Sequence, residues 1–199
     1  IFNLPGNAVN QVFRETVKYD LTKITWLGRV EGIIYVTALS PKSKYQTLED
    51  LKKAPRVNVG TVGLTSTSAL GTIIAAKAMG IKNINSIPHD GSPEAILSAI
   101  RGDVDWVLYP YASLKPHIVD SNNLKPLHVY AEKRLGDLPG VPTVAELGYP
   151  ELVDTVTMHR LVGTTPGVPD DVAKILREAF QKAVNDPGFI KQMRAQSCT

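Results

Sequence analysis

The chain has 199 residues, of which 43% are hydrophobic and 21% are charged, and its formal net charge is +3. This composition is typical of a globular protein with one domain or two small lobes, and it excludes a disordered chain. The lysines and arginines are scattered, which argues against a nucleic-acid surface, and no apolar run approaches the ~18 residues of a membrane span.

Short apolar runs alternate with amphipathic segments along the chain. The apolar runs are rich in β-branched and aromatic residues and predict strands at residues 25–30, 32–39, 56–62, 83–89, 103–109, 124–130 and 154–163. The amphipathic segments predict helices at residues 8–13, 47–54, 66–79, 92–101, 113–119 and 169–185, and a last one from 186 onward. Strands that alternate with helices imply an α/β fold with mostly parallel, covered sheets.

Capping residues place several of the predicted helix ends. Thr47, with Asp50 three residues later, is expected to cap one helix, and Ser92 is expected to cap another. Gly80 and Gly102 follow helical segments, where a left-handed residue ends a helix at little cost.

The turn after the third predicted strand carries an unusual run of hydroxyl residues. Ligands of open α/β sheets bind beyond the carboxyl ends of strands, so such turns are the candidate sites. A helix start leaves unpaired N–H groups and a partial positive charge, and hydroxyls add donors without charge. The turn therefore predicts an anion site at Gly63, Thr65, Ser66, Thr67 and Ser68. The alternative is a simple cap, for which one hydroxyl suffices. No Gly-Lys-Ser/Thr follows, which favours a carboxylate over a nucleotide.

Two later strand ends are further candidates. His89, Gly91 and Ser92 form a strand-to-helix turn that is either a second binding turn or a capped turn. Tyr109 ends a strand, where its ring and hydroxyl can line a pocket or lie half buried at a surface.

The last predicted strand and the start of the chain complete the candidate residues. Thr157 and His159 are expected on one face of that strand, and Arg160 on the other. An arginine in an apolar strand needs a partner, either a bound carboxylate or an internal salt bridge. The opening turn offers a binding loop or mere turn chemistry at Asn3, Gly6 and Asn7.

The motifs of enzymes and metalloproteins are missing from the sequence. It has four histidines without an HExxH pattern, and its single cysteine, Cys198, excludes an internal disulfide and a cysteine-based metal site. There is no nucleophile elbow, no dinucleotide fingerprint and no obvious carboxylate pair. We therefore expect a binding protein without metal or cofactor, not an enzyme.

The sequence resembles the periplasmic substrate-binding receptors of tripartite tricarboxylate transporters, the Bug-type receptors, over nearly all its residues. The order and spacing of several blocks carry the resemblance, among them "YDLTKITWLGRV", "VNVGTVGLTSTSALGTIIAAKAMGI", "IPHDGSPEAILSAIRGDVDWVL" and "LGDLPGVPTVAELGYPEL". The resemblance implies a type II periplasmic-binding fold whose two α/β lobes close on an organic acid. It also implies a periplasmic location and membrane transporter subunits as partners; we expect a monomer that binds no nucleic acid.

The resemblance further implies how the chain divides. Residues 1–35 and 155–199 would form the N-terminal-type lobe, and residues 36–154 the second lobe. Members of the family have a further stretch before Ile1 and more helix after Thr199. We therefore expect a truncated first lobe and a chain that is a piece of a longer protein.

Carried over by position, the family's ligand loops fall on the candidate turns named above and on the strand with Thr157, His159 and Arg160. Many members have Tyr in place of His89, and Asp and Asn in place of Tyr109 and Pro110. An Asp can bind the amino group of an amino acid through its negative charge, whereas Tyr109 carries no such charge. The difference favours an aromatic or apolar carboxylate over an amino acid as the ligand.

Two other functions use a similar fold. The runner-up is the effector-sensing domain of a LysR-type transcriptional regulator, and an enzyme is third. Fold alone does not decide among them.

Overall fold

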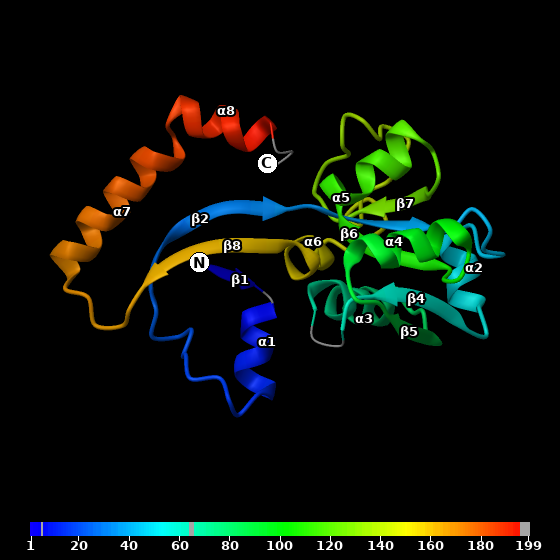
Figure 1. The fold of residues 1–199 in the computed structure, drawn as a ribbon, viewed down its shortest axis with the longest axis horizontal. Coiled ribbons are helices and arrows are strands. Elements are labelled where there is room, and N and C mark those ends of the chain that lie inside the picture. Colours follow the sequence, from blue (N-terminus) through cyan, green and yellow to red (C-terminus); the bar gives the residue numbers. More distant parts are fainter. Residues whose placement is uncertain (5, 64–65, 196–199) are drawn as a thin grey trace. The chain divides into compact units, whose positions relative to one another are not determined.

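The computed structural model describes residues 1–4, 6–63 and 66–195, so Thr65 and Cys198 lie outside the described residues. The chain separates into two compact units, which we call unit 1 (Ile1–Ile33 with Met158–Thr199) and unit 2 (Ile34–Thr157). Each unit has a sheet of its own and helices beside it (Figure 1). The predicted α/β class is confirmed. The expected division into lobes that close on a ligand stays a prediction.

Unit 1 is built on three antiparallel strands. Strand β8 is central and pairs with β1 on one side and β2 on the other. Helix α7 packs on β2, and Gly28 makes this possible, because a Cβ there would lie 2.2 Å from the Phe180 ring. The elements are β1 (Phe2–Leu4), α1 (Gly6–Phe13), β2 (Thr25–Ile33), β8 (Met158–Thr164), α7 (Asp170–Val184) and α8 (Pro187–Ala195).

Unit 2 contains a five-stranded mixed sheet in the order β5-β4-β6-β3-β7. Strand β4 runs parallel to β5 and β6, whereas β3 runs antiparallel to β6 and β7. The strands are β3 (Tyr35–Leu39), β4 (Val57–Thr61), β5 (Ile84–Pro88), β6 (Trp106–Pro110) and β7 (Lys125–Val129). The helical segments are α2 (Leu48–Lys53), α3 (Thr67–Met79), α4 (Ser92–Arg101), α5 (Tyr111–Lys115), the π-helical η1 (Pro116–Asp120) and α6 (Glu151–Val156).

Helices α3 and α4 cover opposite faces of this sheet. Neighbouring residues of a strand point to opposite faces, and Val107 belongs to the core cluster with α4 residues such as Ala95 and Ala99. The next residue, Leu108, lies against Gly71 of α3, where a Cβ would be 3.4 Å from it. Both faces are therefore buried, which explains why residues 106–109 form an unbroken apolar run without alternation.

The predicted helix caps are largely confirmed. Thr47 and Asp50 form a complete capping box at α2, and Gly80 ends α3 with φ of 76°. Helix α4 differs, because Gly91 is its N-cap and Ser92 is its first residue. The Glu94 carboxylate accepts from the Asp90 amide at 3.0 Å and closes the turn instead, which leaves the Ser92 hydroxyl out of the cap.

Two parts of the secondary structure differ from expectation. The antiparallel pairs of β3 and of all unit 1 strands do not follow from the alternation of elements, which predicts mostly parallel sheets. Residues 154–156 end helix α6 rather than begin the last strand. Two acidic residues in the first turn of α6, Glu151 and Asp154, complement its dipole and outweigh the β-branched pattern.

Candidate functional site

A cavity of about 270 Å³ lies at one edge of the unit 2 sheet. This is the carboxyl edge of parallel strands β4 and β6, the edge at which α/β sheets bind ligands. Strand β3 reaches it with its first residue, because antiparallel pairing places Tyr35 opposite Pro110. The lining residues are Tyr35, Val62, Ser66, Thr67, Ser68, Ser92, Tyr109, Pro110 and Ser113.

The amino terminus of α3 forms one wall of this cavity. The turn after β4 contains Gly63 with φ of +63°, a conformation that side chains other than glycine rarely adopt. Ser66 is the N-cap, and its Oγ accepts from the Ala69 amide at 3.2 Å. The first N–H groups of a helix have no intrahelical partner and carry a partial positive charge. An anion at this wall would therefore be stabilised by the dipole of a 13-residue helix.

The contacts of Ser66 favour one direction for the hydrogen bond between Ser66 and Ser68. The Gly63 carbonyl oxygen lies 3.1 Å from Ser66 Oγ and can only accept a hydrogen bond. The single hydroxyl proton of Ser66 is therefore donated to that carbonyl. Ser66 Oγ must therefore be the acceptor in its 3.0 Å contact with Ser68 Oγ. The chain runs from Ser68 to Ser66 to Gly63, so a ligand that takes the Ser68 proton must draw it away from Ser66.

Tyr109 carries an unsatisfied polar atom next to this chain. Its side chain is 3% exposed, and its hydroxyl has no hydrogen-bond partner in the part of the chain that the structure describes. Burial raises the pKa of Tyr109 to about 12, and adjacent Ser68 offsets part of that rise. The two hydroxyls are thus neighbours, although no bond of good geometry joins them. Tyr109 stays protonated near neutral pH and remains available as a donor.

Among the described residues, the lining of the cavity contains no charged side chain. A helix amino terminus is equivalent to about half a positive charge, and hydroxyls contribute dipoles only. This arrangement suits a group with one delocalised negative charge, such as a carboxylate. It offers no counter-ion for an ammonium group and too little positive charge for a single group with two negative charges, such as a phosphonate.

The structure brings together five of the predicted site residues, Ser66, Thr67, Ser68, Ser92 and Tyr109, in this cavity, and Gly63 shapes its turn. Thr65 lies outside the described residues.

The other two residues of the second candidate turn are not in the lining. Gly91 caps α4, and the His89 amide donates to the Thr61 carbonyl at 2.8 Å. The role of His89 in a ligand site stays a prediction.

Sequence reasoning did not single out Tyr35 and Ser113, which also line the cavity. Tyr35 begins its strand rather than ending it, so only knowledge that β3 runs antiparallel to β6 could have placed it at this edge. Ser113 lies in helix α5, one turn after β6 ends.

The remaining candidates have local structural roles. Thr157 is the C-cap of α6, and its hydroxyl donates to the Tyr130 carbonyl at 3.4 Å. In unit 1, Asn3 lies in β1, while Gly6 and Asn7 begin α1 rather than form a free turn. The Asn7 side chain accepts from the Asn3 amide at 2.6 Å. A ligand role for these residues stays a prediction.

Arg160 has a partner within its own unit. Its Nη1 donates to the Glu31 carboxylate at 2.9 Å, and Glu31 is 5% exposed. The internal salt bridge, one of the two predicted partners of Arg160, is therefore present, and a ligand role for Arg160 stays a prediction. His159 Nδ1 lies 3.4 Å from Arg29 Nη1.

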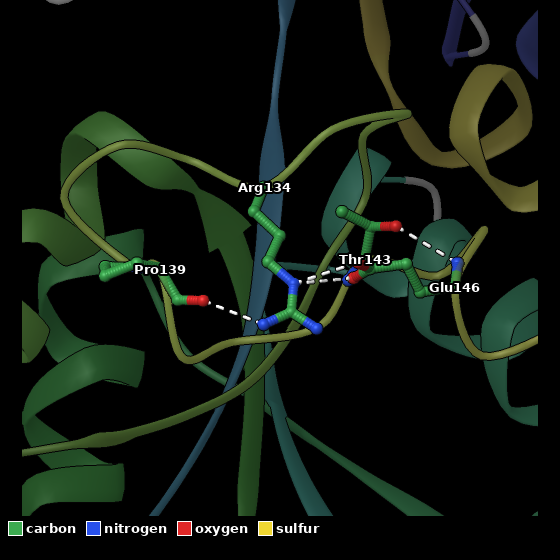
Figure 2. A network of polar contacts seen from close by, with 4 residues as sticks. All are labelled: Arg134, Pro139, Thr143 and Glu146. Carbon is green, nitrogen blue, oxygen red and sulfur yellow. Dashed lines mark hydrogen bonds and ion pairs between the residues drawn. The ribbon is translucent and has the colours of Figure 1, made fainter.

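A polar network organises the long loop between β7 and α6. Arg134 Nε donates to both Glu146 oxygens at 2.9 Å, and its Nη1 donates to the Pro139 carbonyl at 2.8 Å (Figure 2). Thr143 and Glu146 also exchange hydrogen bonds through their amides and side chains, as in a capping box. This loop is therefore ordered by its own side chains.

A second cavity, of about 380 Å³, lies at the opposite edge of the unit 2 sheet. Lys42, Lys44 and Arg56 contribute to its lining, and all three cations have protein contacts. Lys42 Nζ donates to the Arg101 carbonyl at the end of α4, and Lys44 lies over the Tyr45 ring. Arg56 Nε donates to Asn58 Oδ1 at 3.3 Å. Structural roles therefore account for these side chains.

The described ranges contain neither a cluster of metal-binding side chains nor a membrane-spanning helix. No group of three or more His, Cys, Asp or Glu side chains there could hold a metal ion. None of the described helices combines the length and apolarity needed to cross a membrane.

Solved structures define the class of fold. A TctC solute-binding protein from Polaromonas matches with a TM-score of 0.81 at 21% identity, over 99% of this chain and 67% of that one. MatC from Rhodopseudomonas palustris, solved with bound malate, matches with a TM-score of 0.71 at 16% identity, over 95% of this chain and 65% of that one. The fold is that of the solute-binding proteins.

Sequence comparison then gives the family. The tripartite tricarboxylate transporter family receptor pattern matches residues 9–198. Protein BugT of Bordetella pertussis is 29% identical over 185 residues, which are 90% of this chain and 55% of BugT. The chain belongs to the tripartite tricarboxylate transporter receptor family, and it spans about half the length of BugT. The LysR-type alternative is not favoured.

Proposed function

We propose that this chain belongs to a periplasmic receptor that captures a small organic carboxylate and delivers it to the membrane subunits of a tripartite tricarboxylate transporter. Within unit 2, the proposed ligand-binding residues are Gly63, Ser66, Thr67, Ser68, Ser92 and Tyr109. The receptor is not an enzyme and needs no cofactor.

The observation that carries this proposal is the uncharged cavity at the amino terminus of α3. Its helix field and hydroxyl donors match a carboxylate, and nothing in its lining resembles a nucleophile with an adjacent base. Family membership supports a receptor, and malate in the structurally similar MatC supports a small acid as the ligand.

A melting screen tests the proposal. The panel would contain malate, succinate, adipate and citrate, with 3-phosphonopropionate, in which a phosphonate group that can carry two negative charges replaces one carboxylate of succinate. An acid present at about 100 times its Kd should add ~2.7 kcal/mol to the free energy of unfolding. The phosphonate should bind more weakly than succinate, because the cavity offers no full positive charge. If every acid leaves the melting temperature unchanged, the proposed function is wrong.

Thr67→Asp tests the position of the site. Thr67 is the first residue of α3, and an acidic residue there should keep or raise stability, by ~0.3–1 kcal/mol, through the helix dipole. The fixed charge should also repel a ligand carboxylate and weaken binding at least ~10-fold, which is ~1.4 kcal/mol.

Thr67→Asn is the matched control for that variant, because it has nearly the same shape without the charge. Calorimetry would give the affinity of each protein, and denaturant unfolding would give its stability. Equal affinity of Thr67→Asp and Thr67→Asn would mean that the hydroxyl run is only a helix cap.

A further inference from the structure

The buried hydroxyl of Tyr109 has no hydrogen bond to any part of unit 2 that the structure describes. Its oxygen exposes less than 1 Å² and has no hydrogen-bond partner among the described residues. An unsatisfied buried polar group lowers the stability of a fold. A phenylalanine would fill nearly the same space without that cost, so the hydroxyl calls for another explanation.

The position of the hydroxyl limits what it can touch. Tyr109 belongs to the cavity lining, but its hydroxyl oxygen is covered, so we expect it to reach a ligand in the cavity through a neighbouring side chain. Ser68 also lines the cavity, is 5% exposed, and lies close enough to Tyr109 to influence its ionisation.

Ser68 can change its hydrogen-bond partner. It donates to Ser66 Oγ in the chain that ends at the Gly63 carbonyl. A carboxylate at the start of α3 competes for that proton as a charged and stronger acceptor. When Ser68 turns its proton to the carboxylate, its oxygen lone pairs can turn to Tyr109, which has a proton to donate.

We propose that Tyr109 is a positioning residue that acts on the ligand through Ser68. In the bound state the hydrogen bonds run from Tyr109 to Ser68 to the ligand carboxylate. Each bond in such a chain polarises the next, so the Tyr109 hydroxyl strengthens the Ser68 donor. The stability lost to the unsatisfied hydroxyl in the empty protein is recovered when the ligand binds. This inference rests on the proposed function.

Two hydroxyl deletions separate this role from a structural one. Tyr109→Phe removes the hydroxyl that has no hydrogen-bond partner among the described residues. Tyr130→Phe removes another buried hydroxyl, which lies 3.0 Å from both Thr37 Oγ1 and His128 Nε2. The denaturation midpoint without ligand should stay equal or rise in Tyr109→Phe and should fall in Tyr130→Phe. Affinity for the acid with the largest melting shift, beginning with malate, should fall about 10-fold in Tyr109→Phe and stay unchanged in Tyr130→Phe.

A double-mutant cycle tests the connection through Ser68. If Tyr109 acts only through that side chain, Ser68→Ala with Tyr109→Phe should bind the acid as Ser68→Ala does. If the double variant loses affinity by the product of the two single losses, the inference is wrong. It is also wrong if the denaturation midpoint of Tyr109→Phe is as low as that of Tyr130→Phe. If no acid binds the parent protein, the proposed function and this inference fail together. If an acid binds the parent and Tyr109→Phe equally well, only the inference fails.

Discussion

At the scale of single residues, His128 is an ionisable group that is completely buried. It is 0% exposed, and its Nε2 lies 3.0 Å from the Tyr130 hydroxyl, which in turn lies 3.0 Å from Thr37 Oγ1. Its Nδ1 has no partner in the described chain. A neutral ring that donates from Nε2 fits these contacts, because an unpaired lone pair is then left at Nδ1 rather than an unpaired N–H.

The burial of His128 predicts an acid-sensitive fold. Burial lowers its pKa from the ordinary 6.5 to about 3. Between these two values the unfolded chain binds a proton that the folded chain does not, so stability is complete above pH ~6.5 and falls as pH drops towards 3. The loss should reach ~1.4 kcal/mol per pH unit.

Denaturant unfolding from pH 7 to 5, a range above most carboxyl titrations, measures this slope. His128→Gln cannot take up the proton, so its stability should change less over the same range. Identical slopes for the parent and His128→Gln would assign the acid sensitivity to other groups.

The ion pair between Arg160 and Glu31 gives a second prediction at this scale. Arg160→Ala leaves the Glu31 carboxylate, which is 5% exposed, without its partner at 2.9 Å. Since the Arg160 side chain is 43% exposed, solvent reduces the cost, and we expect a loss of ~1–3 kcal/mol.

Urea unfolding compares this variant with Lys174→Ala, which removes an exposed cation from helix α7. Adding Glu31→Gln to Arg160→Ala should recover part of the loss, because the uncompensated charge is then gone. A stable Arg160→Ala with weakened acid binding would instead assign Arg160 to the ligand.

At the scale of elements, local chemistry could be predicted from the sequence and strand direction could not. The Thr47 capping box and the Gly80 stop depend on residues within one turn, so the sequence alone locates them. The cavity at α3 was found for the same reason, because a hydroxyl run between a strand and a helix is a local pattern.

Features that depend on contacts between distant segments could not be predicted from the sequence. Arg160 meets Glu31 across 129 positions of the chain, and Tyr35 reaches the cavity only because β3 runs antiparallel to β6. A periodic pattern records which residues are buried but not the direction in which a strand enters its sheet.

The loop between β7 and α6 gives the prediction at this scale. The Thr143 amide, and then Arg134, lower the pKa of Glu146, so the network requires an ionised carboxylate. Glu146→Ala removes the shared acceptor of Arg134 and Thr143. Amides of residues 131–150 should then exchange hydrogen several-fold faster, because the loop opens more often.

Glu146→Gln is the graded control, since it keeps an acceptor oxygen but loses the charge, and its exchange rates should fall between the other two. Acidification of the parent protein should have the same effect as Glu146→Gln once pH falls through the lowered pKa of Glu146. Unchanged exchange in Glu146→Ala would mean that backbone contacts alone hold the loop.

At the scale of the whole molecule, the buried core is unevenly divided between the two units. Unit 2 contains the core cluster of Val36, Ala38, Val107, Leu114 and Val129, each 0–1% exposed. In the described part of unit 1, only Glu31 and Ala173 are buried. Since apolar burial is the main favourable term in folding, the free energy that opposes opening should be larger in unit 2.

Native-state hydrogen exchange should therefore find the slowest amides in β3, β4 and β6 of unit 2. The amides of β2 and β8 in unit 1 should exchange at least ~10-fold faster, which is a difference of ~1.4 kcal/mol in opening free energy.

Unit 2 is also one continuous segment, Ile34–Thr157, that includes every described residue lining the α3 cavity. Expressed alone, it should unfold cooperatively and keep the denaturation midpoint of its own strands. Equal exchange in β2, β8 and β6 would show that the molecule unfolds as one cooperative body, and a fragment of residues 34–157 without a cooperative transition would show that unit 2 depends on the rest of the chain.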